Sequence, residues 1–194
     1  MNQGHLSYLA SPEWAQALRT DLLPWLESVA ELDGPVIEVG PGPGLTTDLL
    51  RARAASVTAV EIDPELGAAL AQRLAGTNVD VIIGDATQVP LPDDAFGAAT
   101  CFSMLHHMPS AELQDALFAT LCRVLRPGGQ LIAIDSLDTE RIRQGHIDDV
   151  FVPLDQDTIA DRLASAGFTR IVVERAGTYQ ERGDQVRFHA RKPG

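Results

Sequence analysis

Short apolar runs rich in β-branched residues alternate with longer stretches of helical spacing along most of the chain. The apolar runs lie at residues 36–39, 57–60, 79–83, 97–102 and 130–134. The helical stretches between them lie at residues 45–53, 64–74 and 110–125. This alternation is typical of βαβ units, whose strands form a parallel sheet with helices on its faces.

Local signals mark the ends of the expected helices. Asp63 stands directly before Pro64, which predicts an N-cap followed by proline at the first helical position. Ser110 is placed to cap the next helix, and the Pro-Gly-Gly sequence at 127–129 is expected to stop it.

The two ends of the chain depart from this alternation. Residues 12–32 predict one or two helices, interrupted near Pro24, that pack over one end of the sheet. A short helix at 157–166 precedes two expected strands, 168–174 and 185–191, which a non-helical segment joins. Such a pair must be antiparallel, because a parallel pair needs a crossover of a dozen or more residues. The sheet is therefore expected to be mostly parallel, with one antiparallel strand near its end.

Composition and charge restrict the class of protein. A chain of 194 residues with 45% apolar residues can bury a core without disulfides or metals. The formal net charge is −12, which argues against nucleic-acid and anionic-membrane partners, because those surfaces select clustered Lys and Arg. We expect a single domain over residues 1–194 with neither nucleic acid nor membrane as a partner.

Few other signals are present. Cys101 and Cys122 are too few for a disulfide scaffold, and no Cys/His spacing is typical of a zinc site, so no metal is predicted. The first residues lack the features of a signal peptide, and no apolar run approaches the roughly 18 residues that span a bilayer. These features predict a cytoplasmic protein.

The most informative segment is residues 36–44, Val-Ile-Glu-Val-Gly-Pro-Gly-Pro-Gly, where an expected strand runs into a helix. Glycine lets the backbone turn sharply and lets a ligand approach without a Cβ in the way. The helix that follows presents free N–H groups and the positive end of its dipole. Glu61 ends the next expected strand, seventeen residues after Gly44. An acidic residue about 20 residues beyond such a loop is placed to bind the ribose of a nucleoside cofactor.

The glycine spacing separates two classes of cofactor. Dinucleotide loops read Gly-x-Gly-x-x-Gly, whereas this loop reads Gly-x-Gly-x-Gly after Glu38. That pattern resembles motif I of the class I S-adenosylmethionine-dependent methyltransferases. Four further segments, in the family's order, are similar to its other motifs: 84–86 (Gly-Asp-Ala), 96–107, 125–131 (Leu-Arg-Pro-Gly-Gly-Gln-Leu) and 166–168 (Ala-Gly-Phe).

The resemblance covers residues 35–191 and implies the family's three-layer, Rossmann-like α/β fold. That fold has a seven-stranded, mostly parallel sheet in the order 3-2-1-4-5-7-6 with strand 7 antiparallel. Residues 1–34 would form an N-terminal helical cap, and residues 35–194 would form the catalytic core. The implied cofactor is S-adenosyl-L-methionine, which becomes S-adenosyl-L-homocysteine.

The resemblance also implies roles for particular residues. The methionine end of the cofactor would lie against Gly40, Gly42 and Gly44, with Glu38 supporting the loop and the amino group. Glu61 would bind the ribose diol, and Ile62 would pack on adenine. Asp85 and Ala86 would contact the edge of the adenine ring. The backbone of Cys101 and Phe102 would pass beside the sulfonium.

Catalytic residues are harder to predict, because methyl transfer can proceed through alignment of the reactants alone. The candidates are His106, Tyr8 and His146. His106 leaves the fourth expected strand at the edge where such folds bind ligands, and Tyr8 could fold over the pocket. His107 is expected to face the next helix instead. The expected acceptor is a small molecule, and the expected state is a monomer or a homodimer.

Three alternatives to a small-molecule methyltransferase remain. An RNA adenine N6-methyltransferase shares the Glu38 and Glu61 motifs, but its Asn/Asp-x-Pro-Tyr/Phe motif is replaced here by Cys-Phe-Ser-Met at 101–104. A nucleotide-dependent oxidoreductase conflicts with the glycine spacing, and the short-chain type needs a lysine that Lys192, the only lysine, cannot supply. The third alternative is a non-catalytic protein that binds S-adenosylmethionine or S-adenosylhomocysteine.

Overall fold

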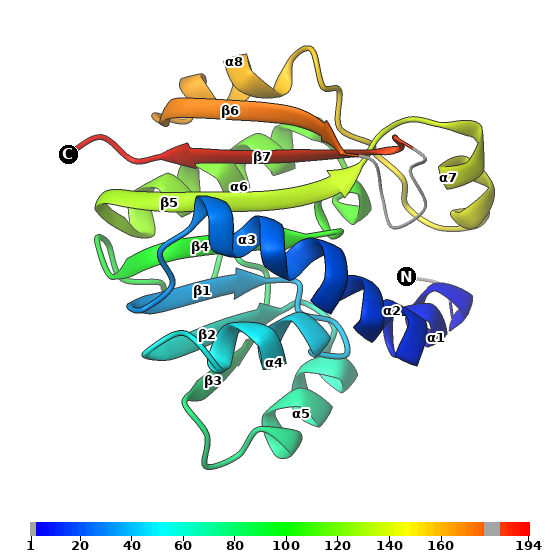
Figure 1. Cartoon of the computed structure of the whole chain (residues 1–194), viewed down its shortest axis with the longest axis horizontal. Coiled ribbons are helices and arrows are strands. Elements are labelled where there is room, and N and C mark those ends of the chain that lie inside the picture. The colour runs from blue at the N-terminus through cyan, green and yellow to red at the C-terminus, as the bar shows by residue number, and fades with distance from the viewer. Residues whose placement is uncertain (1–2, 177–182) are drawn as a thin grey trace.

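A seven-stranded sheet forms the centre of the molecule in a computed structural model that describes residues 3–176 and 183–194. Its strand order is β3-β2-β1-β4-β5-β7-β6, and β7 runs antiparallel to both of its neighbours (Figure 1). The strands are β1 Pro35–Val39, β2 Ser56–Glu61, β3 Val79–Ile83, β4 Phe96–Phe102, β5 Leu125–Ser136, β6 Thr169–Ala176 and β7 Gln185–Arg191. The predicted fold class, strand order and antiparallel strand are confirmed.

Helices cover both faces of this sheet and complete three layers (Figure 1). The helices are α1 Gln3–Leu9, α2 Pro12–Ala17, α3 Leu23–Val29, α4 Leu45–Arg51, α5 Pro64–Arg73, α6 Ala111–Val124, α7 Glu140–Gly145 and α8 Ile159–Ser165. Among residues 3–176 and 183–194, no helix combines the length and apolarity that crossing a bilayer requires.

Two hydrophobic cores form because neighbouring strand residues point to opposite faces of the sheet. On β4, Ala98 packs in the core beneath α3 and α4, whereas Ala99 and Cys101 pack in the core beneath α6 and α8. On β5, Ile132 packs in the core beneath α3 and α4, and Leu131 packs in the core beneath α6 and α8. A sheet buried on both faces explains why its strands read as continuous apolar runs.

The N-terminal helices differ from their prediction in two respects. They continue through Pro24, because Leu18–Leu22 forms a π-helical turn in which the Leu23 N–H donates to Leu18 O. Proline has no N–H to donate to the carbonyl four residues earlier. The π-helical turn shifts the hydrogen-bond register there, so the helix continues where a break was expected. In addition, α3 packs on a face of the sheet, while α1 and α2 extend past the carboxyl ends of its strands (Figure 1).

Capping residues were predicted well, and loop residues less well. The Asp63 carboxylate accepts from the N–H groups of Glu65 and Leu66, and the Ser110 hydroxyl accepts from Leu113. Helix α6 ends at Val124, and the Pro-Gly-Gly segment that was expected to stop it belongs to β5. Most of the segment that joins β6 to β7 lies outside the described residues.

Candidate active site

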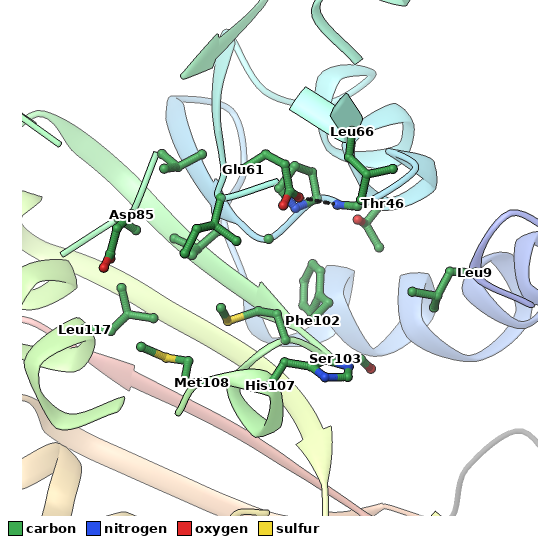
Figure 2. Close-up of a pocket in the computed structure, with 18 of the residues that line it drawn as sticks. Leu9, Thr46, Glu61, Leu66, Asp85, Phe102, Ser103, His107, Met108 and Leu117 are labelled. Atoms are coloured by element: carbon green, nitrogen blue, oxygen red, sulfur yellow. Dashed lines mark hydrogen bonds between the residues drawn. The ribbon is translucent and has the colours of Figure 1, made fainter. Parts of the chain in front are cut away.

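A pocket opens at the carboxyl ends of β1, β2 and β4, where doubly wound sheets bind ligands (Figure 2). The glycine loop after β1 forms one wall, and the N-terminal helices contribute to another. The lining consists of Leu9, Trp14, residues 39–43, 45–46, 60–62, Leu66, residues 84–86, 102–104, 107–109, Leu113 and Leu117. Asp85 and Leu9 lie at opposite ends of this pocket (Figure 2).

Two of the loop glycines are needed for different reasons. Both have backbone angles that favour glycine, with φ +54° at Gly42 and +85° at Gly44. A Cβ at Gly44 would lie 2.3 Å from Leu70 Cδ1, so that glycine permits close packing of the loop against α5. A Cβ at Gly42 would meet nothing within 4 Å, and Gly42 lines the pocket. Gly42 therefore leaves space for a ligand, whereas the space beside Gly44 is occupied by Leu70.

Glu61 lies at the end of β2 and holds the glycine loop. Its Oε2 accepts from the Gly42 N–H at 2.9 Å (Figure 2), and its Oε1 accepts from the Asp63 N–H at 3.0 Å. The residue is only 5% exposed, and it lines the pocket. A carboxylate has about four lone-pair sites, so these two bonds leave acceptor capacity for hydroxyl donors of a ligand.

The residues predicted to contact adenine line one end of the pocket. Ile62 is 69% exposed although its side chain is large and apolar, which is consistent with a ligand-covered surface. Asp85 is held in place because its Oδ1 accepts from the Thr87 N–H and hydroxyl, both at 2.8 Å. Ala86 lies beside it on the same wall. The structure therefore brings Glu61, Ile62, Asp85 and Ala86 around one space.

Of the other residues predicted to contact the cofactor, some line the pocket and some lie behind its lining. Gly40, Gly42 and Phe102 line the pocket. Glu38 is buried beneath the loop, where its carboxylate accepts from the hydroxyls of Thr46 and Thr47 at the start of α4. Gly44 and Cys101 also lie behind the lining, and the Cys101 thiol is buried in the core.

A family model described as a methyltransferase domain matches residues 37–133, which is half of the chain. The chain belongs to the class I S-adenosylmethionine-dependent methyltransferases. The recognition made from the five sequence motifs is thereby confirmed, together with the cofactor class.

Individual relatives of this methyltransferase match parts of it. An uncharacterized methyltransferase of Geobacillus kaustophilus is 32% identical over 122 residues, which are 61% of this chain and 56% of that protein. A ribosomal RNA small subunit methyltransferase A of Moorella thermoacetica is 54% identical over 55 residues, which are 28% of this chain and 19% of that protein. The chain thus spans between a fifth and just over half of these relatives.

A solved structure agrees with the fold of this methyltransferase. The S-adenosylmethionine-dependent methyltransferase from Mesorhizobium loti superposes with a TM-score of 0.73 at 18% sequence identity. The superposition covers 87% of this chain and 96% of that chain.

The catalytic candidates of the methyltransferase adjoin residues of the pocket wall. His106 is 1% exposed, and its Nδ1 lies 2.5 Å from Asp135 Oδ1. Tyr8 packs against Trp14, with ring centroids 5.5 Å apart, and Trp14 lines the pocket. His146 adjoins His106, with centroids 4.8 Å apart. Within the part of the chain that the structure describes, none of these three side chains lines the pocket.

His107 does line the pocket, which corrects the prediction that it faces the next helix. Leu105–His107 forms a 3-10 turn, in which successive side chains point about 120° apart. His106 therefore turns inward to Asp135 while His107 turns to the pocket. An adjacent pair of histidines gives no sequence signal that decides which one faces the ligand.

Ser103 was also missed. It has φ +54°, an uncommon conformation for a residue other than glycine, and it follows β4 directly on the pocket wall. Its buried Oγ has no hydrogen-bond partner among the residues that the structure describes. A strained residue with an unsatisfied hydroxyl at a pocket is a candidate for ligand binding.

Burial raises the pKa of Glu38 to about 7, against the hydroxyls of Thr46 and Thr47, which lower it. The neighbouring carboxylates of Glu61 and Asp48 raise it further. In the folded protein Glu38 is therefore largely protonated at mildly acidic pH, where the same side chain in the unfolded chain is ionised.

This difference predicts a pH-dependent stability. Between pH 4.5 and about 7 the folded state holds a proton that the unfolded state has lost, so stability falls as pH rises. The expected loss is about 3 kcal/mol over that window. Glu38→Gln should remove this pH dependence, so the free energy of unfolding of the variant, relative to that of the natural protein, should rise as pH rises. Urea unfolding at several pH values measures it, with the exposed Glu65→Gln as control, and a pH-independent difference would contradict it.

Proposed function

We propose that this methyltransferase transfers a methyl group from S-adenosyl-L-methionine to a small-molecule acceptor by in-line displacement. The observation that carries the proposal is one pocket that joins the glycine loop and Glu61 to a wall built from the chain's own N-terminal helices. The bound cofactor supplies the reactive methyl group. The protein's contribution is alignment, which contributes roughly 7–11 kcal/mol for a well-oriented pair at most.

The proposed acceptor end lies around Leu9, Trp14, Phe102, Ser103 and His107. This wall is mostly apolar and aromatic, with few polar groups, as small-molecule sites typically are. It favours a small, weakly charged acceptor that Trp14 and Phe102 cover and that Ser103 or His107 orients. Tyr8, His106 and His146 then act as positioning residues, since they contact the residues that form or back this wall.

An RNA acceptor is the second candidate, because the ribosomal RNA methyltransferase relative is 54% identical to this chain over the matched segment. That segment is only 28% of the chain, and the Cys-Phe-Ser-Met sequence at 101–104 has neither a proline nor an aromatic residue in register with those that flank a flipped base. The net charge of −12 also opposes binding to a phosphate backbone. These observations favour the small molecule.

Calorimetry followed by a turnover screen tests the proposal. S-adenosylhomocysteine should bind and NAD should not, because the glycine loop fits the first class of ligand. Release of S-adenosylhomocysteine should then accompany turnover with one of a panel of phenols, amines and carboxylic acids, but not with a ribosomal RNA transcript. Transfer to the transcript alone would establish the RNA candidate. Cofactor binding without transfer to any acceptor would favour a non-catalytic binding protein.

A further inference from the structure

Three imidazole rings gather at the proposed acceptor end of the pocket, with His107 on the pocket wall. The ring centroids of His106, His107 and His146 are 4.1, 4.8 and 5.1 Å apart in pairs. Each ring offers one nitrogen, and these nitrogens all lie within 4.8 Å of one another. His146 comes from a segment about 40 residues after the other two, so only the fold brings the three together.

Hydrogen bonds fix the tautomers of two of these rings. His106 Nδ1 lies 2.5 Å from Asp135 Oδ1, and His146 Nδ1 lies 2.7 Å from the Ile142 carbonyl oxygen. An ionised carboxylate and a carbonyl can only accept, so each Nδ1 carries a hydrogen, and the neutral form of each ring then has its lone pair on Nε2. A histidine that binds a metal almost always donates its other ring N–H to a carboxylate or a backbone carbonyl. Both histidines already have that arrangement.

Two carboxylates adjoin the imidazoles and supply negative charge. Asp135 is fully buried, and its carboxylate lies in hydrogen-bond contact with His106 and accepts from the N–H groups of Leu105 and Ser136. Asp149 Oδ2 lies 3.9 Å from His107 Nδ1. A divalent cation among these rings would be balanced by two nearby anions, which lowers the cost of placing a charge in a buried site.

The segments that carry the three histidines are held firmly. Gln114 Nε2 donates to the carbonyls of Leu105 and Val152, and the Val152 N–H donates to His106 O. The Phe151 ring stacks on His146 with centroids 4.7 Å apart. These contacts join the 3-10 turn to the loop after α7, so the imidazoles face one another from a connected framework.

We propose that His106, His107 and His146 bind one divalent transition-metal ion, with Zn²⁺ or Co²⁺ as suitable occupants. Imidazole nitrogens suit these ions, and three histidines with one open position are typical of catalytic zinc sites. Nitrogens bound to one tetrahedral zinc ion are about 3.4 Å apart, so small side-chain rotations would close the present spread. Because His107 also lines the pocket, the ion would adjoin the acceptor. The absence of a zinc spacing in the sequence is explained by the distance between His107 and His146 along the chain.

Metal binding can be tested without any methyl transfer. The tag-free, chelator-treated full chain should bind one equivalent of Zn²⁺ in competition with a chromogenic chelator, and Co²⁺ should give the intense visible absorption of a four-coordinate ion. His146→Ala and His107→Gln should each weaken Zn²⁺ binding more than 100-fold, and Asp135→Asn, which alters the partner of His106, about 10–100-fold. His189→Ala on β7, outside the cluster, is the matched control and should bind as the natural chain does.

Two results would overturn the proposal. One is binding to the natural chain that is no tighter than binding to the triple His106/His107/His146→Ala chain. The other is one-equivalent binding that survives both His146→Ala and His107→Gln, with circular dichroism showing both variants folded. If the triple variant fails to fold, the two single variants and the Co²⁺ spectrum decide the question. Because no turnover is measured, failure here leaves the proposed methyl transfer intact, and failure to find an acceptor leaves the metal site intact.

Discussion

Replacing Asp135 with alanine is expected to lower the free energy of unfolding by about 3–5 kcal/mol. The side chain is fully buried, and it accepts from the Leu105 N–H at 2.7 Å, from the Ser136 N–H at 2.7 Å and from His106. Alanine would leave these donors without their acceptor in an interior where an unsatisfied polar group costs about 1–3 kcal/mol. The loss should therefore exceed that of an ordinary hydrogen bond.

Urea unfolding of the metal-free chain at constant pH measures this loss. Asp135→Asn should cost less than alanine, since the amide keeps the volume and one acceptor oxygen. Asp80→Ala, on the exposed side of β3, is the matched control and should change stability by about 0.5 kcal/mol or less. A loss below 1 kcal/mol for Asp135→Ala would show that water or a shift of the 3-10 turn satisfies the freed donors.

The fold could be predicted because its signals are local. Apolar runs mark strands buried on both faces, and Asp63 and Ser110 mark helix starts, as the structure confirms. The π-helical turn before Pro24 could not be predicted in the same way. A proline in a helical pattern predicts a break, but the segment stays helical through the π-helical turn, and Leu18, Leu22 and Leu26 pack in one core with residues of the sheet.

The side of the pocket formed by the glycine loop, Glu61 and Asp85 could be predicted for a related reason. Strand order and strand ends place the glycine loop, Glu61 and Asp85 at one edge, so residues distant in sequence meet through a known topology. The side of the pocket near the N-terminal helices has no such rule. Trp14 reaches the pocket through the path of the N-terminal helices, and His146 reaches His106 through the loop after α7. Neither contact could be predicted from the spacing of residues in the sequence or from composition.

Replacing Glu61 with alanine is expected to weaken S-adenosylhomocysteine binding by about 1–3 kcal/mol, roughly 5- to 150-fold in Kd. Two effects contribute. The proposed bonds to the ribose hydroxyls are lost, and the Gly42 and Asp63 N–H groups lose the acceptor that holds the loop. Calorimetry measures Kd, with Glu65→Ala as the control, because Glu65 is exposed on α5 and does not line the pocket. An unchanged Kd in a folded Glu61→Ala chain would contradict both roles.

A double-mutant cycle with a chemically altered ligand separates the two effects. If Glu61 bonds the ribose, Glu61→Ala should weaken adenosine binding more than binding of 2′-deoxyadenosine, since the second ligand lacks one of the hydroxyls. The difference between the two losses is the coupling energy, expected at about 0.5–3 kcal/mol for groups in contact. If Glu61 only holds the loop, the two losses are equal, because loop order affects both ligands alike. In that case the ribose diol must be bound by another group on the pocket wall, and Glu61 acts on the cofactor through the Gly42 backbone alone.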